Sequence, residues 1–288
     1  MTLPVTGVTG RYGRPMDVSL CLDPGRPWPQ VRDLARSAER AGAHTLYVPD
    51  HFLPHDPDAG TTDGPMLEAW TLLTALAVHT ERPRLGTLVL GTTYRHPAVV
   101  ANMAATLDHA SGGRVVLGLG AGWQENEHVA YGIELPPVAQ RLDRFEESVR
   151  VTRSLLRQPR STIAGRYFQL QDAPCQPAPL QPELPILIGG GGEKRTMRIA
   201  ARYADAWHTW STPEDFARKN AVLDRRCDEV GRDPSEIRRV TGRFFDEPRE
   251  AADRVAAFQA SGADEFVLVD HRDQPPETTL DMIVRADP

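Results

Sequence analysis

The chain has 288 residues, 40% of them hydrophobic and 25% charged, which is the composition of a globular protein with a large core. Its formal net charge of −6 argues against nucleic acid as the main partner, because nucleic-acid binding usually shows as a basic surface. No apolar run approaches the ~20 residues that span a bilayer, and residues 1–14 lack the apolar core of a signal peptide. The 3 cysteines lie far apart and predict neither disulfides nor a zinc site. We therefore expect a cytoplasmic protein that binds no metal.

Apolar periodicity predicts strands and helices in strict alternation. The expected strands are residues 17–22, 45–49, 85–90, 115–117, 186–188, 206–209, 238–244 and 265–269. The expected helices are residues 28–41, 66–79, 97–110, 137–156, 194–203, 213–230, 249–259 and 277–284. A short hairpin over 163–170, followed by a proline-rich connection, interrupts the alternation after the fourth helix.

Eight strand–helix pairs predict an α/β protein, a single (β/α)8 TIM barrel over residues 16–288, preceded by an N-terminal extension over 1–15. A doubly wound sheet is the alternative. A dinucleotide-binding sheet of that kind carries Gly-x-Gly-x-x-Gly after its first strand. Here Gly118, Gly120 and Gly122 have a different spacing and follow the fourth strand, which favours the barrel.

In a barrel, functional residues lie on the loops after the strands. Asp50 and His51 follow the second strand, and histidine is the commonest general acid or base. A packing role for both residues and a metal site including His55 are the alternatives. Arg95 and His96 follow the third strand, where capping and contacts between helices are the expected roles.

Two glycine-rich turns follow the next two strands. The first, Gly118–Trp123, offers close backbone access to a ligand at Ala121 and Gly122, with an aromatic side chain at Trp123. The second has four glycines, Gly189, Gly190, Gly191 and Gly192, before a helix expected to begin at Glu193 or just after it. Consecutive N–H groups at a helix N-terminus bind phosphate, and the basic residues Lys194, Arg195 and Arg198 follow directly.

These motifs together resemble the bacterial luciferase-like monooxygenase family, and within it the oxidoreductases that use the deazaflavin coenzyme F420. The resemblance extends over about residues 17–262. The matching segments are residues 50–52, 95–97, 107–114, 118–123, 189–195 and 204–207.

The resemblance implies a barrel that holds the F420 ring at its C-terminal mouth, with a non-prolyl cis peptide, Leu88–Val89, behind the ring. It implies that His51 handles the proton that accompanies hydride transfer and that Asp50 holds the ring or orients the site. Ala121, Gly122 and Trp123 would lie beside the cofactor, and Gly189–Gly192 with Glu193 would bind its phosphate. Tyr94 and His55 would face the substrate. It also implies a homodimer, formed through the second and third helices.

The sequence departs from relatives at positions that bear on the cofactor and the substrate. Sugar-phosphate dehydrogenases of the family have glutamate where Trp123 stands, which puts that substrate in doubt. Luciferases that use flavin have arginine at the position of Ala121, so its absence favours F420 over FMN. An FMN-dependent monooxygenase, a non-catalytic cofactor-binding barrel and a metal-dependent hydrolase remain the alternative functions, and the substrate is expected to be a small molecule.

Overall fold

The computed structural model describes residues 16–54, 64–243, 248–271 and 273–286. The expected extension over 1–15 and His55 lie outside this part of the chain. No helix within the described ranges is long and apolar enough to cross a membrane.

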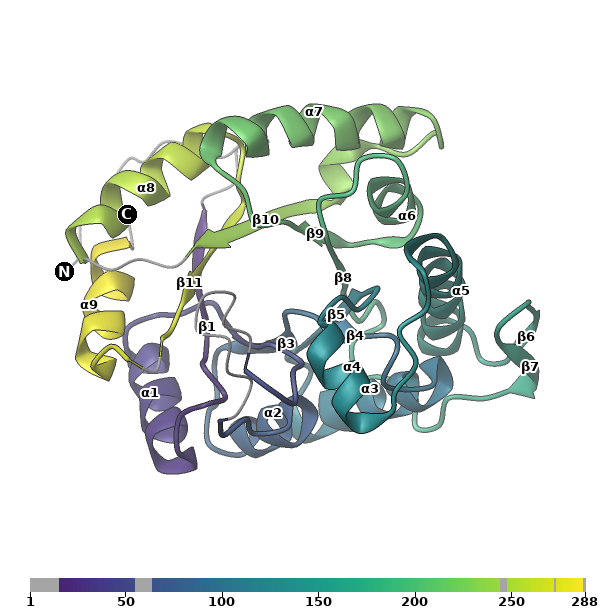
Figure 1. Cartoon of the computed structure of the whole chain (residues 1–288), viewed down its shortest axis with the longest axis horizontal. Helices are drawn as coiled ribbons and strands as arrows, with labels where there is room; N and C mark the ends of the chain where they lie inside the picture. The colour runs from purple at the N-terminus through teal and green to yellow at the C-terminus, as the bar shows by residue number, and fades with distance from the viewer. Residues whose placement is uncertain (1–15, 55–63, 244–247, 272, 287–288) are drawn as a thin grey trace.

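Parallel strands form a closed ring in the centre of the molecule (Figure 1). Their hydrogen-bonded order is β3-β2-β1-β11-β10-β9-β8-β5-β4, and a further pairing of β3 with β5 closes the barrel. The strands are β1 (Asp17–Cys21), β2 (Thr45–Val48), β3 (Arg84–Thr87), β4 (Leu90–Gly91), β5 (Val115–Gly120), β8 (Ile186–Gly189), β9 (Ala206–His208), β10 (Arg238–Arg243) and β11 (Glu265–Val269). The expected TIM barrel is confirmed.

Helices surround the strands on the outside, as Figure 1 shows. They are α1 (Trp28–Arg40), α2 (Ala69–Ala77), α3 (Pro97–Ser111), α4 (Glu125–Tyr131), α5 (Val138–Arg157), α6 (Thr196–Tyr203), α7 (Pro213–Asp228), α8 (Pro248–Ala260) and α9 (Pro276–Ala286), with a 3₁₀ turn at Pro234–Glu236. The expected hairpin is present as β6 (Ser161–Ala164) and β7 (Gln169–Ala173), which project beside α5.

The structure differs from the expected elements at several places, and three of these differences bear on the C-terminal end of the barrel. The strand expected over 85–90 is split into β3 and β4 by the expected cis peptide bond between Leu88 and Val89. The short helix α4 was not expected, because its seven residues contain no apolar period. Helix α6 begins at Thr196, two residues later than expected, because 193–195 form a turn after the glycines.

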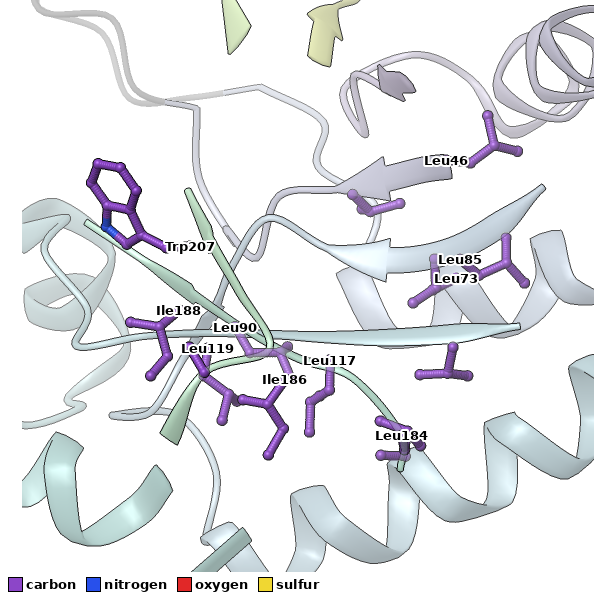
Figure 2. Close-up of a cluster of buried hydrophobic side chains, with 14 of the residues drawn as sticks. Leu46, Leu73, Leu85, Leu90, Leu117, Leu119, Leu184, Ile186, Ile188 and Trp207 are labelled. Atoms are coloured by element: carbon purple, nitrogen blue, oxygen red, sulfur yellow. The ribbon is translucent and has the colours of Figure 1, made fainter. Parts of the chain in front are cut away.

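Alternation along the strands separates two apolar cores. The larger core lies between the barrel and the helices, where Figure 2 shows Leu117 and Leu119 of β5 beside Ile186 and Ile188 of β8. The smaller core lies inside the barrel and consists of Cys21, Tyr47, Leu88, Val116, Leu187, Ala206, Val240 and Val267. Side chains therefore fill the inside of the barrel, and a ligand site has to lie at one of its ends.

The N-terminal end of the barrel is closed by a buried polar network around Glu265. This carboxylate accepts hydrogen bonds from Ser19 Oγ (2.6 Å) and Tyr47 Oη (3.0 Å), and Arg238 Nε donates to it at 3.0 Å. Arg238 also pairs with Asp17. Both carboxylates of this network share the Arg238 guanidinium, as expected of the end that contributes stability.

Candidate active site

The loops that follow β2, β4, β5 and β8 build the opposite, C-terminal end of the barrel, which we call the mouth. His51 follows β2 directly, and its ring is about one fifth exposed. Its Nδ1 lies 2.9 Å from Oε1 of Glu127, which comes from α4 and has no exposed side-chain surface. A histidine–carboxylate pair therefore lies where the sequence predicts a catalytic histidine.

Glu127 is a buried carboxylate with donors on both oxygens. Its Oε2 accepts the backbone N–H groups of Phe52 (2.7 Å) and Leu53 (3.2 Å), and its Oε1 accepts from His51 and from the Tyr94 hydroxyl. Burial by itself would raise the pKa of Glu127, but the hydrogen bonds from His51 and Tyr94 outweigh it, so that the pKa lies below its ordinary value. Glu127 is therefore ionised at neutral pH and connects three loops of the mouth.

Asp50 is occupied by protein donors. Arg95 donates to both of its oxygens (2.7 and 3.0 Å), and the N–H of Gly91 donates at 2.9 Å. Burial raises the pKa of Asp50, although Arg95 opposes the rise. Arg95 also pairs with Glu68. Of the two roles implied for Asp50, this arrangement favours orienting the site, because its oxygens are already bonded.

The aromatic residues of the mouth pack around His51 and Tyr94. Trp123 is 55% exposed and meets the His51 ring edge to face, with 5.5 Å between ring centroids. Tyr94 packs against Phe52, while its hydroxyl points to Glu127. Tyr94 is thus turned toward the carboxylate. His96 has the expected capping role, since its Nδ1 accepts the N–H of Ala98 at the start of α3.

Val89, the second residue of the cis bond, fills the space beside two glycines. A methyl group on Gly120 would lie 2.6 Å from Cγ2 of Val89, and one on Gly189 would lie 2.9 Å from the same atom. Larger residues cannot occupy these positions without moving Val89. The sequence assigned Gly189 to phosphate binding, and the structure shows that both glycines also make room for Val89.

The turn after β8 presents backbone donors. The N–H of Gly190 donates to His208 O, at 2.9 Å. Within the described part of the chain, the N–H groups of Gly191, Gly192 and Glu193 donate to no acceptor. Unbonded N–H groups in succession are the donor set that suits a phosphate.

Two cations near this turn have different partners. Arg195, one of the three basic residues that follow the glycines, pairs with Asp143 and donates to the carbonyl of Ala139 on α5. Lys219 of α7 lies beside the glycines: a methyl group on Gly191 would be 2.7 Å from its Nζ. The Lys219 ammonium also pairs with Asp215, at 2.9 Å.

His208 is the last residue of β9 and lies inside the barrel, since its neighbour Trp207 packs in the outer core. It is 3% exposed, and its Nε2 is buried without a hydrogen-bond partner among the described residues. Burial lowers the pKa of His208 from an ordinary 6.5 to about 3. His208 is therefore neutral in the folded protein at neutral pH.

Sequence reasoning missed Glu127 and Lys219. Glu127 belongs to a polar run, Gln124–Glu127, that gives no sign of burial apart from its place after the fourth strand of the barrel. Lys219 lies four residues after Asp215 on a helix, a spacing typical of a solvent-exposed ion pair. Only the fold brings them to the mouth.

The family model for luciferase-like monooxygenases matches residues 14–285. The chain belongs to this family. One relative, an uncharacterised protein of Mycobacterium tuberculosis, is 31% identical over 254 residues, which cover 78% of this chain and 89% of the relative.

Among other luciferase-like relatives, the F420-dependent glucose-6-phosphate dehydrogenase of Microbacterium testaceum is 35% identical over 212 residues. The match covers 72% of this chain and 61% of that protein. Two solved structures share the fold. An F420-dependent secondary alcohol dehydrogenase in complex with an F420-acetone adduct has a TM-score of 0.83 at 22% identity, covering 95% of this chain and 99% of that one. The F420-dependent tetrahydromethanopterin reductase of Methanopyrus kandleri has a TM-score of 0.78 at 17% identity, covering 94% and 98%.

Proposed function

We propose that this protein is an F420-dependent oxidoreductase that transfers a hydride between the deazaflavin and a small organic substrate. Membership of the luciferase-like family and the names of several relatives support this function. The observation that carries the proposal is that one barrel mouth combines a phosphate-type donor turn with a histidine–carboxylate pair. Each feature corresponds to one part of such a reaction: anchoring the coenzyme and moving a proton.

The residues present fit a phosphorylated cofactor. Gly191, Gly192 and Glu193 would hold the phosphate through their N–H groups, and the ammonium of Lys219 would supply the opposite charge. Leu88 and Val89 would support the ring from one side, and Ala121, Gly122 and Trp123 would border it at the end of β5. When bound, F420 supplies or accepts the hydride.

His51 is the group that handles the proton. A hydroxyl-bearing carbon that loses a hydride becomes a carbonyl only when the hydroxyl proton also leaves, and in the reverse direction the proton has to return. Histidine is the side chain that most often serves as general acid and general base, which suits both directions. Its Nδ1 is occupied by Glu127, so Nε2 is the nitrogen that exchanges the proton with the substrate. Trp123, exposed beside His51, forms a wall for the substrate.

An FMN-dependent monooxygenase is the second candidate, because the matching family model is described by that activity. A titration of the purified protein with F420 and, in parallel, with FMN separates the two. We expect saturable binding of F420, recognised by its single violet absorption band and blue-green fluorescence, and weaker or no binding of FMN. Tighter binding of FMN would replace the proposal with the monooxygenase.

We also propose a homodimer formed through α2 and α3. The family resemblance is the ground for this proposal, and each helix exposes one apolar side chain: Val78 at the C-terminal end of α2 (71%) and Val99 in the first turn of α3 (53%). Light scattering should give about twice the chain mass of 31.8 kDa. A monomer at micromolar concentration would contradict this.

A further inference from the structure

Glu127 contacts the proposed catalytic histidine and has no counterpart among the residues expected from the sequence. We propose that Glu127 is the positioning residue of this site: it holds the proton of neutral His51 on Nδ1 and stabilises the charged ring when Nε2 takes up a second proton. The inference rests on the proposed function for its catalytic meaning. The contact itself is a property of the protein without cofactor.

The hydrogen-bond partners of Glu127 determine which nitrogen of neutral His51 carries the proton. An ionised carboxylate only accepts hydrogen bonds. Glu127 accepts the backbone N–H groups of Phe52 and Leu53 on one oxygen, which suits the ionised form, so the nitrogen 2.9 Å from its other oxygen has to donate. Nδ1 of His51 therefore carries the proton, and Nε2 of the neutral ring has a free lone pair. That lone pair is what a general base needs.

The position of the ring is fixed from two sides. Glu127 itself cannot move, because the N–H groups of Phe52 and Leu53 hold its other oxygen. Trp123 also meets the His51 ring, at an interplanar angle of 81°. A ring flip would break the carboxylate contact. A base, a group that orients it and a fixed geometry are the parts of a catalytic dyad.

The other charged groups near His51 leave Glu127 as its counterion. Asp50, the preceding residue, is neutralised by Arg95, and Arg95 is shared with Glu68. Tyr94 shares Oε1 of Glu127 with His51, and its hydroxyl stays protonated, because burial first and the carboxylate second raise the pKa of Tyr94. The negative charge beside the His51 ring thus comes from Glu127. The Tyr94 hydroxyl weakens its effect on the ring by donating a hydrogen bond to the same oxygen.

The first test reads the tautomer of His51 by nitrogen-15 NMR of the histidine rings in protein without cofactor. The chain has 9 histidines, and the signal lost in His51→Gln identifies the one in question. We expect the Nδ1–H form in the wild type. In Glu127→Gln the amide can still accept from Phe52 and Leu53 but turns its NH₂ toward the ring, so we expect the Nε2–H form. Glu125→Gln, an exposed change on the same helix, is the matched control and should leave the wild-type form.

The second test is the pH dependence of the same signal. Removal of the negative charge in Glu127→Gln should destabilise the charged His51 ring and move the midpoint of this pH dependence to lower pH. Tyr94→Phe should keep the Nδ1–H form and move the midpoint upward, because Oε1 is then shared with no second donor. With F420 and substrate, Glu127→Gln should lower kcat by about tenfold or more and leave the affinity for F420 unchanged.

Either of two NMR results would overturn the inference: an Nε2–H form in the wild type, or an Nδ1–H form that persists in Glu127→Gln. Should Glu127→Gln not fold, a change of tautomer in Tyr94→Phe would contradict the proposal equally. Failure of F420 to bind would remove the proposed function but leave these results standing, so the two failures are distinguishable.

Discussion

The two ends of the barrel each contain a buried carboxylate, and the two are paired differently. At the N-terminal end, Glu265 is bonded to the guanidinium of Arg238, which has a second carboxylate in Asp17. At the mouth, Glu127 is bonded to neutral donors and to His51, with no arginine or lysine of the described residues in contact. The first arrangement is a permanent ion pair. The second has a histidine as partner, a side chain that can be neutral or charged.

This difference indicates which end of the barrel has polar groups available to a ligand. Polar groups at the N-terminal end are satisfied by each other, so that they contribute to stability and cannot respond to a ligand. At the mouth, Nε2 of His51 and the N–H groups after β8 have no partner among the described residues and remain for ligands. Four changes test this division.

The largest effect is expected at the mouth, from His51→Ala. Loss of a general acid or base should lower kcat by about 10²–10⁴-fold, because the substrate proton has no acceptor. The affinity for F420 should remain within about twofold, since His51 does not contact the phosphate turn. Stopped-flow turnover and a binding titration on the same preparation measure both. Unchanged turnover would show that His51 is not the proton-handling group.

Glu265→Ala tests the opposite end and should act on stability. Arg238 and the hydroxyl of Tyr47 would lose their shared acceptor in a buried region, which costs about 3–5 kcal/mol of unfolding free energy. Urea denaturation measures the loss. Affinity for F420, corrected for the folded fraction, should not change. A loss below about 1 kcal/mol would mean that the network contributes little stability.

His208 lies between the two ends and should make folding sensitive to acid. Its pKa is lowered by burial to about 3, below the ordinary 6.5 that applies in the unfolded chain, so the unfolded state binds the proton more readily. The contribution of neutral His208 to the free energy of unfolding is fully present above about pH 6.5 and is lost as the pH falls toward 3. Between pH 7 and pH 5 this loss is about 2 kcal/mol.

The pH test compares urea denaturation of the wild type with that of His208→Gln, which keeps a polar side chain without the titration. We expect the variant to lose about 2 kcal/mol less than the wild type between pH 7 and pH 5. Parallel pH profiles for the two proteins would show that His208 is not buried in its neutral form.

The smallest effect is expected from Lys219→Ala. Removal of the ammonium beside Gly191 should weaken F420 binding about tenfold, and added salt should narrow the difference from the wild type. Arg195→Ala is the matched control, because Arg195 is directed to α5 and its loss should leave the affinity unchanged. A larger effect from Arg195 than from Lys219 would reverse our assignment of the cation.

The barrel and part of the site were predictable because they depend on local patterns. Alternation and the glycine stops locate the strands, and residues at their ends, such as Asp50 and His51, face the mouth by topology. Glu127 was not predictable, because it lies 76 positions from His51 and its helix has no apolar period. The partner of Arg195 was not predictable either, because a sequence gives the sign of a charge but not the residue with which the side chain pairs.

The position of the bound cofactor at the mouth tests the proposed function most directly. A crystal structure of the protein with F420 measures it. We predict the phosphate within hydrogen-bond distance of the N–H groups of Gly191 and Gly192 and near Lys219, with the ring beside Leu88–Val89 and within reach of His51. A phosphate held elsewhere, or a ring remote from His51, would contradict the proposed function.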